Sequence, residues 1–169
     1  MTMTETPSPY FLRYLKLVPE TDLLSAMQVQ LNELDAFFRE IPADQLGRTH
    51  PPYTWKVRQV IIHIIDSEHI FAYRALRFAR ADQTPLPGFE ENDFARRTLD
   101  DARSAVELAD DFRAMRTSNL LMFRSFSKEA WSRRGLANQL EWGVTDIARA
   151  IVGHARHHAE ILKKRVGSS

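Results

Sequence analysis

The sequence predicts an all-α protein, a four-helix bundle with one long connection at about residues 81–98. Four segments place apolar residues at every third or fourth position, which is the spacing of one helix face, and no strand-like alternation survives beside them. The 169 residues include only 6 glycines, so the helical patterns run on without interruption. We expect one helical-bundle domain at 19–166, preceded by a tail and a short arm at 1–18 and followed by a disordered end at 167–169.

The first helix follows Pro19 and stops before Pro42. Thr21 or Asp22 can cap its N-terminus, since either side chain can accept a hydrogen bond from the first turn. It should end at Ile41, because the residue before a proline resists the α-helical conformation. Its apolar face consists of Leu24, Met27, Leu31, Leu34, Phe38 and Ile41.

The second helix is expected from about 55 to 80, after a turn-rich link at 42–53. Thr54 is its expected N-cap. The apolar face is wide and includes one histidine, His63, one turn beyond Val60. A lone histidine in such a place is most often a hydrogen-bonded core residue, so His63 alone does not indicate a ligand.

The third helix follows the long connection and is expected at 99–126. Thr98 and Asp101 form a pair that resembles a capping box at its start. Its apolar stripe contains one polar residue, Asn119. That amide either lines a pocket or is a core group bonded to a neighbour.

The last helix is expected at about 144–166, after a link at 127–143, and it carries His154 and His158. Residues four apart lie on the same face of an α-helix, about one turn from each other. Both histidines continue the apolar stripe of this helix, so both should face the core. Two buried imidazoles need polar partners, and their spacing is that of a pair of metal ligands.

Three inward histidines on two helices predict a metal site. Helical bundles build such sites from the inward side chains of facing helices, and here those side chains are His63, His154 and His158. Three neutral imidazoles leave at least one coordination position open, as in catalytic sites for zinc or nickel. In the alternative interpretation, each histidine is a satisfied core residue and no metal binds.

Other polar residues have two interpretations each. Asp66, three residues after the first histidine, either orients an imidazole or lies on the helix surface. His157 belongs either to the surroundings of the metal or to the surface. Arg74 and Arg77 form either a pocket for an anionic substrate group or a solvated face, and Asn119 is a candidate pocket residue. We assign no ligand role to Glu68, Glu160, His50 and His69.

Composition excludes several classes of protein. With 23 Lys and Arg against 22 Asp and Glu, a net charge of +1 gives no field suited to nucleic acid or an anionic membrane. The absence of cysteine excludes disulfides, a thiolate nucleophile and cysteine-ligated zinc. No apolar stretch approaches about 18 residues and the start shows no secretory signal pattern, so we expect a cytoplasmic protein.

The order of these motifs resembles the DinB/YfiT-like superfamily over about residues 20–165. The motifs are WKVRQVIIHIIDSE at 55–68, FAYRALR at 71–77, LPGF at 86–89 and GHARHH at 153–158. The resemblance implies a four-helix bundle, often a homodimer, that holds a divalent metal through three histidines. In this sequence the family's three ligand positions fall on His63, His154 and His158.

The resemblance implies several activities. Relatives in the superfamily include thiol transferases that use bacillithiol, mycothiol-dependent isomerases and proteins called metal-dependent hydrolases. We therefore expect an enzyme of small molecules in which Zn²⁺ or Ni²⁺ activates a thiol or water. A thiol would come from a low-molecular-weight cosubstrate, because the chain has no cysteine. The alternatives are a non-catalytic metal-binding or stress-response protein and an all-α interaction module.

Overall fold

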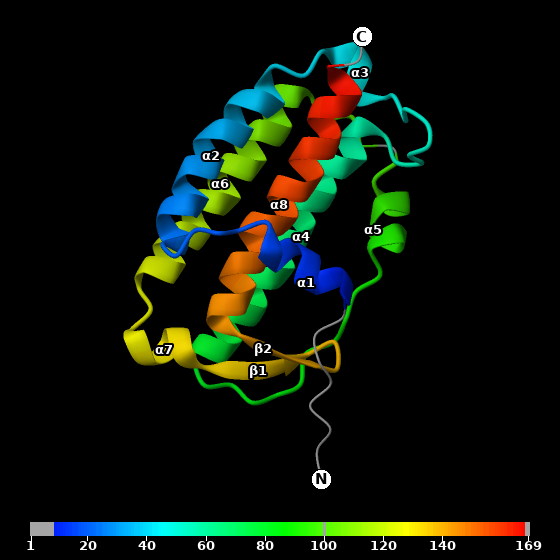
Figure 1. The fold of residues 1–169 in the computed structure, drawn as a ribbon. Coiled ribbons are helices and arrows are strands. Elements are labelled where there is room, and N and C mark those ends of the chain that lie inside the picture. Colours follow the sequence, from blue (N-terminus) through cyan, green and yellow to red (C-terminus); the bar gives the residue numbers. More distant parts are fainter. Residues whose placement is uncertain (1–8, 100, 168–169) are drawn as a thin grey trace.

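The computed structural model describes residues 9–99 and 101–167 and confirms the four-helix bundle (Figure 1). Its long helices pack in two pairs, the first with the third and the second with the fourth. These helices are α2 (Leu23–Arg39), α4 (Val57–Ala79), α6 (Ala105–Arg124) and α8 (Val144–Val166). Apolar side chains from all four form one core. Of the tail and arm predicted at 1–18 and the end predicted at 167–169, residues 1–8 and 168–169 lie outside the described residues.

Short elements fill the connections. They are α1 (Pro9–Lys16), α3 (Ala43–Leu46), α5 (Glu91–Arg97), α7 (Lys128–Ser132), β1 (Arg134–Ala137) and β2 (Leu140–Gly143). The two strands form a small antiparallel hairpin, which the sequence analysis did not predict. Each strand has only four residues, too few for an alternating pattern to stand out, and the turn residues Asn138 and Gln139 both have positive φ.

The helix boundaries partly match the predictions. Asp22 caps α2 by accepting a hydrogen bond from the Ser25 backbone N–H at 3.0 Å, as expected. This helix ends at Arg39, two residues before the predicted end at Ile41. Thr54 does not cap α4. Lys56 is its N-cap, and the backbone N–H of that lysine donates to the Gln59 side chain at 2.8 Å.

The third long helix starts later than predicted. Ser104 and Glu107 form a capping box at its start, in which the Ser104 N–H donates to the Glu107 carboxylate at 2.8 Å. Thr98 instead ends α5, and its hydroxyl donates to the Ala95 carbonyl at 3.0 Å. The connection predicted at 81–98 is partly helical, because it contains α5.

A buried ion pair lies in the bundle interior. Arg116, fully buried on α6, donates from Nε and Nη2 to the two carboxylate oxygens of Glu68 on α4, both at 2.6 Å. Its Nη1 donates to the Gln30 side chain of α2 at 3.0 Å. Gln30 in turn donates to the Val152 carbonyl of α8 at 2.9 Å. One polar network thus connects the four long helices.

The short helix α1 crosses α8 (Figure 1), and its backbone contacts the last helix at Gly153. A Cβ atom at Gly153 would lie 2.1 Å from the Tyr14 carbonyl oxygen, which is backbone and has no rotamer to change. Two bonds from α8 also hold the chain after α1: Arg149 donates to the Val18 carbonyl, and Arg156 donates to the Glu20 carboxylate at 2.7 Å. The glycine therefore lets this arm lie directly on the last helix.

Within the described residues, no helix combines the length and the apolar character that a membrane span requires.

Breaking the buried ion pair should destabilise the protein strongly. We expect Glu68→Gln to lower the free energy of unfolding by about 3–5 kcal/mol, because it leaves a buried guanidinium without a counter-charge. Denaturant unfolding measures this loss. Glu129→Gln, which breaks the exposed pair with Arg133, is the control and should cost less than about 0.5 kcal/mol. A loss below about 1 kcal/mol for Glu68→Gln would contradict the prediction.

Asp35 should give the protein a stability that depends on pH. Its pKa is lowered to about 2, mainly because its carboxylate accepts a hydrogen bond from Arg113 at 2.5 Å and further bonds from Arg39. A carboxyl whose pKa is lower in the folded state stabilises above its unfolded pKa, so this contribution should disappear as the pH falls from about 4 to 2. Unfolding midpoints across that range should fall less for Asp35→Asn than for the wild type. Asp44→Asn, at an exposed pair, should follow the wild type.

Candidate metal centre

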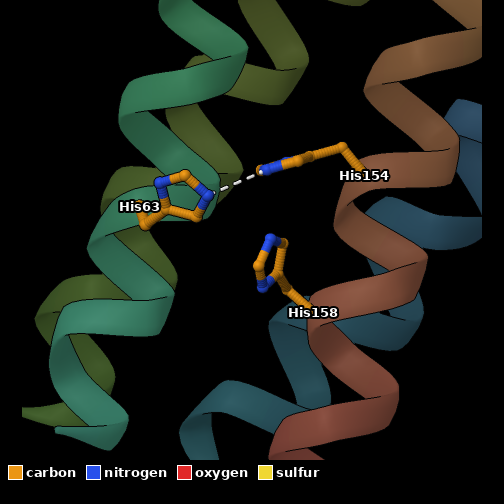
Figure 2. Close-up of side chains that lie close together, drawn as sticks. All are labelled: His63, His154 and His158. Atoms are coloured by element: carbon orange, nitrogen blue, oxygen red, sulfur yellow. Dashed lines mark hydrogen bonds between the residues drawn. The ribbon is translucent and has the colours of Figure 1, made fainter. Parts of the chain in front are cut away.

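Two helices bring the three histidines together. On α4, His63 lies on the buried face between Val60 and Ile64 and is 6% exposed. On α8, His154 and His158 follow one another by one turn, and His154 is 5% exposed. Figure 2 shows the three rings pointing toward one another across the interface between the two helices. The helical spacing predicted from sequence thus produces one cluster of imidazoles.

The ring nitrogens are close enough to share one ion. One nitrogen from each histidine lies within 4.8 Å of the other two, and Nε2 of His63 is 3.0 Å from Nε2 of His154. Two nitrogens bound to the same tetrahedral zinc at about 2.0–2.1 Å lie roughly 3.3 Å apart. The three rings therefore need only small adjustments to reach the geometry of a three-histidine site.

The surroundings of the cluster suit ligands better than core histidines. Nε2 of His158 is buried and has no hydrogen-bond partner among the described residues. Aromatic rings pack edge-on against the other two imidazoles: Trp55 against His63, and Tyr14 and Phe71 against His154. A buried imidazole nitrogen without a partner costs free energy that a bound cation would recover.

All three imidazoles are neutral near pH 7. Burial lowers the pKa of His63 to about 4 and that of His158 to about 2. Burial also lowers the pKa of His154, and repulsion from charge on His158 and His63 lowers it further. Metal ligation requires neutral imidazoles, so the site is in the protonation state that a metal needs.

Comparison with known proteins identifies the family. The family model described as the DinB superfamily matches residues 26–162, which is most of the chain. This chain belongs to the DinB superfamily.

Curated relatives in Bacillus carry a common name. A protein of Bacillus cereus (strain ATCC 14579) is 31% identical over 145 residues, covering 80% of each chain. Another, of Bacillus mycoides (strain KBAB4), is 30% identical over 134 residues, covering 75% of this chain and 73% of its own length. Each of these relatives is named "putative metal-dependent hydrolase".

A solved structure has the same fold. YfiT from Bacillus subtilis superimposes with a TM-score of 0.68 over 100% of this chain and 94% of its own, at 16% identity. It is described as a probable metal-dependent hydrolase with an unusual four-helix bundle topology. At this identity the likeness concerns the fold alone.

In this DinB protein, the neighbours of the histidine cluster differ partly from those predicted. Ser67, rather than Asp66, is the partner of His63, with its hydroxyl 3.4 Å from Nδ1. Burial raises the pKa of Asp66, which is half-buried beside α5. His157 lies next to the cluster, half-buried, with its ring edge-on to those of Tyr14 and His158.

Of the three residues considered as pocket groups, only Arg74 lines a cavity near the cluster. Asn119 faces the bundle interior, where it donates to the Glu68 carboxylate at 3.1 Å, so it is the core amide of the alternative interpretation and not a pocket residue. Arg77 does not reach the cluster. Its guanidinium bonds Asp82 and Tyr73 at the far end of α4. Arg74 is buried and lines a cavity beside His154.

Two cavities reach the cluster, each at a different histidine of α8. One, of about 300 Å³, is lined by His158, Trp55 and the link before α4. The other, of about 190 Å³, is lined by His154 and Arg74 and by residues of α1, α5 and the hairpin. Each cavity therefore has room for a small molecule next to one imidazole of the cluster.

The sequence analysis missed several residues that shape the site. Arg116 and Gln30 complete the interior network, and Ser67 contacts His63. Arg116 lies four residues after Phe112, on the buried side of α6, so a charge within an apolar stripe was the available signal. The hairpin residues that line the His154 cavity had no such signal.

Proposed function

We propose that His63, His154 and His158 bind one divalent metal ion, Zn²⁺ or Ni²⁺, and that the protein is a metal-dependent hydrolase of small molecules. The observation that carries the proposal is the convergence of three neutral imidazoles, one of which, His158, has a buried Nε2 without a hydrogen-bond partner among the described residues. The names of the Bacillus relatives support the same reaction class.

The protein side chains would prepare the site for hydrolysis. A metal held by three imidazoles lowers the pKa of water or a thiol in its open position and so supplies a nucleophile near neutral pH. Ser67 restrains the ring of His63 through Nδ1, which leaves Nε2 directed at the other two histidines. Trp55, Phe71 and Tyr14 surround the imidazoles with apolar surface and limit access of bulk water.

Metal binding should require the three clustered histidines and should not depend on histidines elsewhere in the chain. We expect purified protein to contain about one equivalent of Zn²⁺ or Ni²⁺, and His154→Ala to lose most of it because two imidazoles hold an ion weakly. Elemental analysis after gel filtration measures the content. His69→Ala, at an exposed position on α4, is the control and should keep the metal. Equal metal contents in the two variants would contradict the assignment.

Hydrolysis should require the same residues. Steady-state turnover of a panel of small esters and amides should fall at least about 100-fold on chelation and in His63→Ala, and added Zn²⁺ or Ni²⁺ should restore only the chelated wild type. Thiol transfer stays a prediction, and parallel assays with an added low-molecular-weight thiol distinguish it from hydrolysis. Turnover that appears only with the thiol would replace the hydrolase assignment by a transferase.

Dimer formation, which the family resemblance implies, also stays a prediction, and sedimentation of the metal-loaded protein tests it.

A further inference from the structure

Arg74 is a buried cation without a counter-charge. Its side chain is 4% exposed, and it donates from Nη2 to the Pro87 carbonyl at 2.8 Å. No carboxylate in the described part of the chain forms an ion pair with it. Arg116, the fully buried arginine of α6, has the Glu68 carboxylate as its partner. Burying a charge without a partner is costly, so such a group indicates a ligand that supplies the opposite charge.

The guanidinium lines the cavity that also reaches the histidine cluster. His154 forms another part of the wall of this 190 Å³ space, so one small molecule can contact both groups. Much of the remaining wall is apolar and aromatic: Tyr14, Phe71, Phe89, Leu140 and Trp142. The volume is below the roughly 300–1,000 Å³ of sites for drug-sized ligands, which restricts the occupant to a compact molecule.

The loop that holds Arg74 is itself fixed. Pro87 follows Leu86, whose backbone N–H donates to the Leu136 carbonyl of the hairpin at 2.9 Å. The Asn138 N–H returns a bond to the Leu86 carbonyl at 3.0 Å. The guanidinium is therefore positioned before a ligand arrives, which reduces the entropy cost of binding.

The one carboxyl group in this wall does not form an ion pair with the arginine. Glu91 lines the same cavity, but it forms no ion pair with Arg74 in the residues that the structure describes. Burial raises the pKa of Glu91, and the neighbouring charge of Glu90 raises it further. Because this half-buried carboxylate does not pair with Arg74, the guanidinium still lacks the partner that an anionic ligand would supply.

We propose that this cavity is the substrate subsite and that it selects small carboxylates with a ring or a short apolar chain. Arg74 binds the carboxylate, and the apolar part lies against Phe71 and Trp142. Resting on the hydrolase function proposed above, the subsite places the bond to be cleaved toward His154. Uncharged analogues of the same shape bind more weakly, because they leave the guanidinium unpaired.

Titration calorimetry with benzoate tests the subsite, with benzamide as the neutral analogue. Full-length protein is used both after chelation and loaded with Zn²⁺, so that binding to Arg74 is distinguished from binding to the ion. We expect benzoate to bind about 10- to 100-fold more tightly than benzamide in both forms, as for a charge-assisted hydrogen bond. Arg74→Gln should abolish this preference, and Arg74→Lys should keep part of it. Arg77→Gln is the matched control, since its guanidinium lies outside the cavity on the same helix, and it should behave as the wild type.

Each outcome decides the proposal. Preference for benzoate that depends on Arg74 in the chelated protein supports the subsite even if no hydrolysis is found. The proposal is overturned if benzoate binding requires Zn²⁺ and is unchanged in Arg74→Gln. It is also overturned if benzoate and benzamide bind with equal affinity. Inorganic phosphate bound as tightly as benzoate overturns the role of the apolar wall. Circular dichroism checks the fold of each variant. If Arg74→Gln does not fold, Arg74→Lys decides: the proposal is overturned if this variant loses the whole preference for benzoate, and equally if it keeps the wild-type preference unchanged.

Discussion

The bidentate ion pair between Glu68 and Arg116 is the interaction on which the arrangement of the four long helices depends. Both charges are removed from water, and a buried pair of this kind tolerates little displacement, because a partly separated pair keeps its desolvation cost and loses its attraction. Gln30 extends the pair from α4 and α6 to α2 and α8. Apolar packing alone permits helices to slide by small amounts, whereas this directional network specifies one register.

That register is also the register of the histidine cluster. Gln30 bonds the carbonyl of Val152, two residues before His154, and Glu68 follows His63 by five residues on α4. The network therefore fixes the same two helix segments that carry the three imidazoles. A metal site needs its ligands within a few tenths of an ångström, and a neighbouring polar network on rigid helices provides that precision.

The parts of the site predictable from sequence are those that local periodicity encodes. His154 and His158 were predicted to share a buried face because four residues make about one turn, and His63 because it continues an apolar stripe. Partners across the bundle are not encoded in this way, so the sequence left open whether Asn119 lines a pocket or bonds a core neighbour, and the structure shows its bond to Glu68. The start of α6 was predicted after Thr98, where a capping signal precedes the apolar stripe. The same kind of signal recurs six residues later at Ser104, and the helix begins there. Tertiary contacts decide between such equivalent signals.

The division between bundle and connections has a consequence for chemistry. The four long helices supply the imidazoles and the network that aligns them, whereas much of the wall of the His154 cavity comes from α1, the loop around Pro87, α5 and the hairpin. These connecting segments can change in length and sequence without disturbing the core. One bundle with one set of histidines can therefore serve different reactions, and in the subsite proposed above Arg74 is the α4 side chain that meets these connections.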